Sequence, residues 1–240
     1  MISLLLFIKK SNYRRYKRIG MFIILYLFTT FLIIPKTSPI FGREKIKNSE
    51  LVKAHSVFYI LTNRNYVRPA LNKSISNIAQ QLYQKHKGIQ LVYLDANFPF
   101  IDKFPLLPHL SHNDGKKIDV TLIYKDEHGK ITNKKPSVSG YGVFENPTSK
   151  EYNQIPICKQ KGYWQYDFPK YLTFGILNKD LKFSVNGTRN LVNYIVNESS
   201  VGKLFIEPHL KTRMRLKNSK IRYHGCQAVR HDDHIHFQVK

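Results

Sequence analysis

Acidic residues are scarce in this sequence. Only 16 Asp and Glu stand against 39 Lys and Arg, which gives a formal net charge of +23 over 240 residues. Such a chain suits polyanionic partners, and outside the cytoplasm these are the cell wall and phospholipid head groups. The alternative is a solvated basic surface without a specific partner. The sequence holds none of the motifs of nucleic-acid-binding proteins, so we expect no nucleic-acid partner.

Cysteine is almost as rare, with only Cys158 and Cys226. Neither forms a lipobox, which excludes anchoring through a lipidated N-terminal cysteine. Two cysteines can form one disulfide in an oxidising compartment, or they can remain two buried thiols. Because Cys226 lies five residues before His231, a disulfide would anchor the approach to the last strand.

The sequence also lacks internal repeats and low-complexity segments, which excludes repeat architectures. The first forty or so residues are not typical of a globular domain, and the remaining ~195 are enough for a single domain. Apolar residues make up 42% of the chain and aromatic residues 13%, which is enough for a core. Strand and helix patterns alternate without regular βαβ spacing. This mixture predicts an α+β fold, a single domain with a central antiparallel sheet flanked by helices.

Local patterns place the main elements of that domain. A helix is expected from Pro69 to about His86, with one apolar stripe facing the core. A second helix is expected to be capped by Asn186 or Thr188, and a third to begin at Pro208. The expected strands are residues 57–61, 89–94, 118–124, 203–207 and 235–239.

The N-terminal segment is directed to a membrane. Six cations lie between Lys9 and Arg18, ahead of an apolar run over residues 19–34, and no acidic residue precedes Glu44. This asymmetry predicts that the N-terminus stays in the cytoplasm while the rest crosses the membrane. The run is shorter than the ~20 residues of a spanning helix and suits a signal peptide, yet no A-x-A cleavage site follows. An uncleaved signal-anchor and a cleaved signal peptide both remain open.

These observations divide the chain into three parts. Residues 1–42 are expected to be the basic flank and the signal segment, residues 43–56 a polar tether, and residues 57–240 the folded domain. The domain would then be periplasmic or otherwise extracytoplasmic, held at the inner membrane if the segment is not cleaved.

Histidine is concentrated at the end of the chain, in the sequence Arg-His-Asp-Asp-His-Ile-His-Phe over residues 230–237. If Ile235 and Phe237 form the core face of a strand, the period of two places His234 and His236 on the opposite face. Two imidazoles side by side on a rigid strand suit a zinc site, where one binds the metal and the other works beside it. The alternative is an exposed polar face at the chain end.

A second cluster upstream favours the zinc site. His112 lies on a loop that turns at Gly115, and Asp119 begins an alternating, strand-like run. Together with His236 these residues supply three ligands and leave a fourth position open for water. This is the pattern of a catalytic rather than a structural zinc ion, and we expect one Zn²⁺ per chain.

Both motifs resemble those of the LAS metallopeptidases. Ser-His-x-x-Gly-x-x-x-Asp followed by Val-Thr-Leu, and then a C-terminal His-Asp-Asp-His-x-His-Phe, occur in the order and relative placement of that group. The ending is most similar to that of the penicillin-insensitive murein endopeptidases. The resemblance implies that His236 is a ligand and His234 a catalytic helper. His231 would hold the substrate or the tetrahedral intermediate, and His109 would lie near the metal as a ligand or at the rim.

The function implied is zinc-dependent hydrolysis of D-alanyl peptide cross-links in peptidoglycan. One alternative is a D,D- or L,D-carboxypeptidase, which needs a cationic clamp for the terminal carboxylate. Arg64 and Arg68 are candidates for that clamp, or else ordinary surface arginines. Another is a non-catalytic cell-wall-binding protein with a relict metal site. Asp232 or Asp233 could orient a histidine through its second ring nitrogen, or both could only form a turn.

Overall fold

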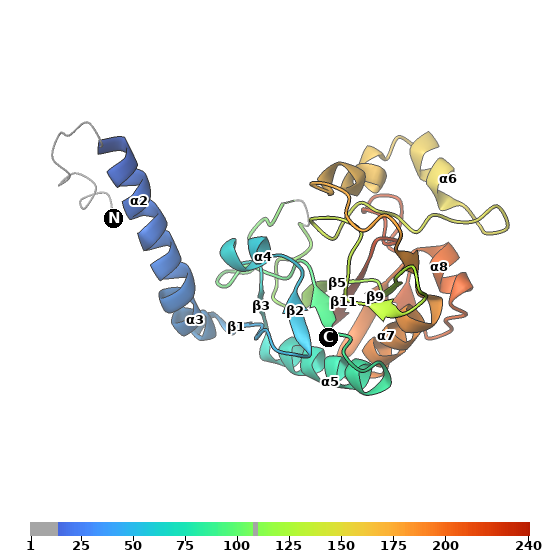
Figure 1. The fold of residues 1–240 in the computed structure, drawn as a ribbon, viewed down its shortest axis with the longest axis horizontal. Coiled ribbons are helices and arrows are strands. Elements are labelled where there is room, and N and C mark those ends of the chain that lie inside the picture. Colours follow the sequence, from blue (N-terminus) through green and yellow to red (C-terminus); the bar gives the residue numbers. More distant parts are fainter. Residues whose placement is uncertain (1–13, 108–109) are drawn as a thin grey trace.

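The computed structural model describes residues 14–107 and 110–240 (Figure 1). The expectation for His109 and part of the expected basic flank therefore lie outside the described residues. The described chain has an α+β fold, as the sequence predicts. Its main sheet has six strands in the order β10-β9-β11-β5-β4-β2.

The prediction of an antiparallel sheet is correct only for the inner strands. Neighbours among β9 (Val201–Phe205), β11 (His234–Val239), β5 (Lys117–Thr121) and β4 (Leu91–Tyr93) are antiparallel. The edge strands β2 (Val52–Ala54) and β10 (Ile221–Arg222) pair in parallel with β4 and β9, so the sheet is mixed. Each edge pair is joined through a helix, which is the crossover that a parallel pair requires.

Residues 43–56 are part of the fold rather than a tether. β1 (Glu44–Lys45) pairs with β3 (Tyr66–Val67), and β2 completes one edge of the main sheet. Val52 and Ala54 are buried while Lys53 is exposed, the alternation of a half-buried strand. A pattern of three residues among polar neighbours is too short to predict a strand from the sequence.

Residues 57–61, predicted as a strand, form the helix α4 (Val57–Leu61). The reason is an N-cap residue, Ser56, which starts the helix although the apolar residues after it are typical of a strand. The side chain of Ser56 accepts a hydrogen bond from the backbone N–H of Phe58 at 3.2 Å. Such a bond satisfies one of the free donors at a helix start.

One face of the main sheet is covered by two helices, α5 (Pro69–Lys85) and α7 (Val185–Asn197) (Figure 1). α5 begins at the predicted proline, and its predicted stripe is buried. α7 is capped by Ser184, whose side chain accepts from Gly187 N–H at 3.2 Å, and not by Asn186 or Thr188. The buried residues of the stripe on α5 are Leu71, Ile75, Ile78 and Leu82.

Shorter elements surround this core. A small sheet is formed by β7 (Ile131–Thr132), β6 (Tyr124–Lys125) and β8 (Lys182–Phe183), and α8 (Pro208–Arg213) starts at the predicted proline. Two further helices, α6 (Gln154–Gln160) and η3 (Trp164–Leu172), lie on the side of the sheet opposite α5 and α7 (Figure 1). The candidate site lies between the sheet and η3.

The N-terminal helix extends away from the domain (Figure 1). It runs continuously through α2 (Arg14–Phe28), η1 (Thr29–Ile33), α3 (Ile34–Thr37) and η2 (Ser38–Phe41). The whole stretch Arg14–Phe41 has 28 residues, with a mean hydropathy of 2.0 in its most apolar window, and is long and apolar enough for a signal sequence or a membrane anchor. It exceeds the sixteen-residue apolar run because helical geometry continues into the flanking residues.

Candidate metal centre

The two sequence motifs meet because β11 pairs with β5. In this antiparallel pair His236 lies directly opposite Asp119, and His234 opposite Thr121. Ile235 and Phe237 are fully buried in the core, so the predicted alternation of the last strand is confirmed. Directly opposed residues share a face of a sheet, which is why Asp119 and His236 point the same way.

His112 completes a group of three potential ligands. Oδ1 of Asp119 lies 2.8 Å from Nδ1 of His236 and 3.2 Å from Nε2 of His112. The two ring nitrogens lie 3.1 Å apart. One ligand atom from each residue falls within 4.8 Å of the others, and all three side chains are buried. The structure therefore brings the three predicted ligands together.

Gly115 shapes the loop that delivers His112. Its φ is +78°, in the left-handed region that disfavours residues with a side chain. An added Cβ would lie 2.9 Å from Nε of Arg43 and 2.9 Å from Cγ of Arg68. Glycine is thus required there both for the turn and for the packing of two arginines against it.

Neighbouring groups orient these ligands. Nδ1 of His112 donates to the backbone carbonyl of Ala96 at 2.9 Å, which turns Nε2 toward the other two candidate ligands. The Tyr141 hydroxyl donates to Oδ2 of Asp119 at 2.8 Å, and Oδ1 faces His112 and His236. Two imidazole nitrogens and one carboxylate oxygen are a donor set that fits zinc, and His112 and Asp119 are each held by an outer partner.

His234 is held by Asp233 and not by Asp232. Nδ1 of His234 lies 2.5 Å from Oδ1 of Asp233, whose Oδ2 accepts from the Gly142 N–H at 2.6 Å. Asp232 is instead paired with Arg230. Nε2 of His234 lies 3.8 Å from Oδ2 of Asp119, at the edge of the metal group. The structure thus gives the two aspartates different roles, which the sequence left open.

Burial and neighbouring charges set the protonation of this cluster. Burial alone would raise the pKa of Asp119, but His112 and His234 hold it well below its usual value. Burial disfavours the charged form of His234, yet Asp233 and Asp119 outweigh it and raise the pKa to about 9. For His231, burial together with nearby His234 keeps the pKa well below 6.5. Asp119 is therefore a carboxylate and His231 a neutral imidazole at neutral pH.

A cavity of about 290 Å³, which we call the metal cavity, opens beside the three candidate ligands. His231 lines it, with its ring centroid 4.9 Å from that of His234 and 5.8 Å from that of His236. Another histidine in this wall, His224, was not predicted from the sequence, and its ring lies 5.5 Å from that of His231. Its only sequence signal is its position seven residues before His231. Leu110 and Gln165 also line the cavity without having been predicted, whereas Gln227, Ala228 and Val229 stand where the resembled family often carries aromatic residues near its substrate pocket.

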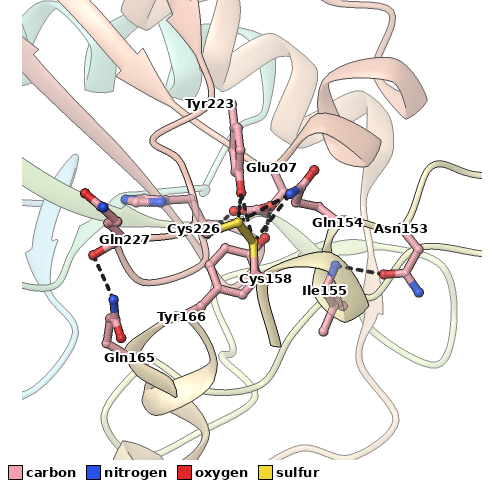
Figure 2. The surroundings of a disulfide bond; sticks show 11 residues. Asn153, Gln154, Ile155, Cys158, Gln165, Tyr166, Glu207, Tyr223, Cys226 and Gln227 are labelled. Carbon is pink, nitrogen blue, oxygen red and sulfur yellow. Dashed lines mark hydrogen bonds between the residues drawn. A yellow bond between two sulfur atoms is a disulfide. The ribbon is translucent and has the colours of Figure 1, made fainter. Parts of the chain in front are cut away.

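The two cysteines form a disulfide, with their Cα atoms 5.2 Å apart (Figure 2). It joins α6 to the loop before β11. Cys226 lies between His224 and Gln227, both of which line the cavity. The disulfide therefore fixes one wall of the cavity to α6. From the sequence it was expected only to anchor the approach to the last strand.

The two candidate clamp arginines lie elsewhere. Arg64 forms a buried ion pair with Asp95, and Arg68 pairs with Asp102 at 3.1 Å and donates to the Asp114 carbonyl at 2.9 Å. Among the described residues that line the metal cavity, none is a lysine or an arginine.

Comparison with protein-family models gives no match, and comparison with curated proteins gives none either. A function is therefore inferred from the residues and their arrangement.

Proposed function

We propose that this protein is a zinc-dependent murein endopeptidase that hydrolyses D-alanyl cross-links in peptidoglycan. The convergence of His112, Asp119 and His236 from two distant motifs is the main support. These residues would hold one Zn²⁺ and leave room in the cavity for water and a substrate carbonyl. The resemblance of both motifs to those of murein endopeptidases supports the substrate.

The chemistry divides between the metal and the protein. When bound, zinc lowers the pKa of water and polarises a carbonyl. His234, oriented by Asp233 and protonated at neutral pH, donates from Nε2 to the developing oxyanion. His231 lines the same cavity next to His234, where it would contact the substrate.

An extracytoplasmic location is part of the proposal. The 28-residue apolar helix supports export or anchoring at the inner membrane. The Cys158–Cys226 disulfide supports an oxidising compartment, where such bonds persist. Residues 43–240, which hold 32 of the 39 cations and all 16 acidic residues, have a net charge of +16, and this also suits the anionic cell wall.

The carboxypeptidase alternative has less support. Trimming a stem peptide requires a cation for the free terminal carboxylate, and neither lysine nor arginine is among the described residues lining the cavity. A non-catalytic wall-binding protein would be expected to lack a metal ligand or the helper histidine. This chain keeps the three candidate ligands and the candidate helper, His234.

One experiment tests the function directly. The full chain in mild detergent is incubated with purified muropeptide dimers and, separately, with monomers ending in D-Ala-D-Ala, and products are identified by mass. We expect cleavage of dimers to monomers that a chelator abolishes and zinc restores. Cleavage of monomers alone would indicate a carboxypeptidase, and binding without cleavage of either would indicate a wall-binding protein.

A further inference from the structure

A second cavity opens beside α4. Its volume is about 400 Å³, larger than that of the metal cavity. Arg64 and Asp95 lie in its wall, but they neutralise each other, and Nη1 of Arg64 also donates to the Leu107 carbonyl at 2.7 Å. The cavity therefore offers mainly apolar surface. Its apolar walls come from Phe58, Tyr59, Leu107, Val138, Leu172 and Phe174.

Several of these side chains are also exposed at the entrance. We call the four lining residues Phe58, Leu107, Val138 and Phe174, together with Val57 beside Phe58 in the sequence, the apolar rim. Their exposed fractions, in that order, are 53%, 71%, 41%, 71% and 64%. Large apolar residues gathered at the mouth of an apolar cavity are unusual on a soluble domain and mark a contact with protein or membrane.

The apolar rim is close to the N-terminal helix. The Tyr26 hydroxyl donates to the Leu61 carbonyl at the end of α4 at 2.5 Å, and Nδ2 of Asn63 donates to Oγ1 of Thr30 at 3.3 Å. These polar groups of the apolar helix thus have partners in the domain, while Phe22 and Ile24 stay exposed. This is the distribution expected in hydrocarbon, where a polar group must be satisfied by protein.

We propose that the apolar rim is a membrane-contacting surface, and that the second cavity takes up a lipid acyl chain from the bilayer that holds the N-terminal helix. The proposal rests on the membrane anchoring included in the proposed function. Because α4 is hydrogen-bonded to the helix, a bilayer around the helix also meets α4.

The test uses the full chain in vesicles of phosphatidylethanolamine and phosphatidylglycerol with brominated acyl chains, which quench nearby tryptophan. Trp164 is the single tryptophan and lies outside the apolar rim, with 73% exposure. Phe58→Trp, Phe174→Trp and Leu172→Trp are each made in a Trp164→Phe background. We expect all three to lose emission relative to vesicles without bromine, while the native chain, reporting from Trp164, keeps its emission.

Full emission from Phe58→Trp and Phe174→Trp in chains that float with the vesicles would overturn the membrane contact. Quenching at these two positions but not in Leu172→Trp would overturn the acyl-chain site. Cross-linking between copies through the apolar rim, without quenching, would show that a second copy covers it. Far-UV circular dichroism of each variant, compared with that of the native chain, verifies folding. Loss of muropeptide cleavage would affect the proposed function alone, since quenching does not depend on catalysis.

Discussion

The Tyr141 hydroxyl donates a hydrogen bond of 2.8 Å to Oδ2 of Asp119, the carboxylate whose other oxygen faces His112 and His236. The next residue, Gly142, donates its N–H to Asp233, which holds His234. One turn of the chain thus supports both the candidate ligand and the candidate helper. Gly140 at its start has φ +87°, and an added Cβ would lie 2.2 Å from Leu94, so the turn has little freedom to shift.

Tyr141→Phe is expected to weaken zinc binding by roughly 10–100-fold, because it removes the hydrogen bond that fixes the Asp119 carboxylate. Affinity is measured by competition with a chromogenic chelator. Tyr59→Phe is the matched control, since its hydroxyl is also buried and donates to the Ser139 carbonyl at 2.7 Å in the same turn. Equal loss in both variants would mean that Tyr141 only stabilises the turn.

His236→Ala and His234→Ala are expected to differ although both residues lie on one face of β11. Loss of His236 removes a ligand, so elemental analysis should find little zinc. His234→Ala keeps three ligands and near-stoichiometric zinc, but its turnover of muropeptide dimers should fall at least ~100-fold. Metal loss in both variants would make both residues ligands. Normal turnover in His234→Ala would show that His234 is not the helper and would make His231 the next candidate.

Removal of the disulfide is expected to loosen the cavity wall without removing the metal. In Cys158→Ser/Cys226→Ser, the free energy of unfolding should fall by about 2–5 kcal/mol, as for other native disulfides. Zinc content should stay unchanged because no ligand lies in the released loop. KM for the dimer should rise more than kcat falls, since His224 and Gln227 lose their anchor. Loss of zinc together with the disulfide would contradict this separation.

Lys135 gives the folded state a defined pH dependence. Its ammonium is buried, with Nζ donating to the Leu122 carbonyl at 3.2 Å, and burial lowers its pKa to about 7. Between pH 7 and about 10 the unfolded chain, with a lysine pKa near 10.4, binds more protons than the folded chain. Stability contributed by neutral Lys135 is therefore complete above the unfolded pKa and lost as pH falls toward 7.

Urea unfolding of the full chain in detergent should reveal this as a rise of up to ~1.4 kcal/mol per pH unit in that window. Lys135→Met, which cannot ionise, should lack the rise, and its advantage over the native chain should be largest at pH 7 and below. Parallel curves for the two proteins between pH 7 and 10 would show that Lys135 is not a buried base in the folded state.

The orientation of the chain can be tested with reporters fused after Lys240. We expect activity from a reporter that works only outside the cytoplasm, because the cations of the N-terminal flank precede the apolar helix. A strong signal from a reporter confined to the cytoplasm would contradict both the location and the cell-wall substrate.

Local sequence determined much of this protein. The period of two in residues 234–239 fixed which side chains of the last strand face the core, and the apolar stripe of α5 fixed its buried face. Such patterns can be read because they depend on neighbours within a few residues. The candidate ligands could be named for the same reason, since each lies in a short, dense motif.

Only the tertiary structure decided how distant segments meet. Asp119 and His236 are 117 residues apart, and their contact depends on the register of β5 against β11. The roles of Tyr141, Asp233 and the disulfide likewise arise from loops that pack across the sheet. The short edge strand β2 and the parallel pairing at both edges were mispredicted because pairing depends on partners that a single segment does not specify.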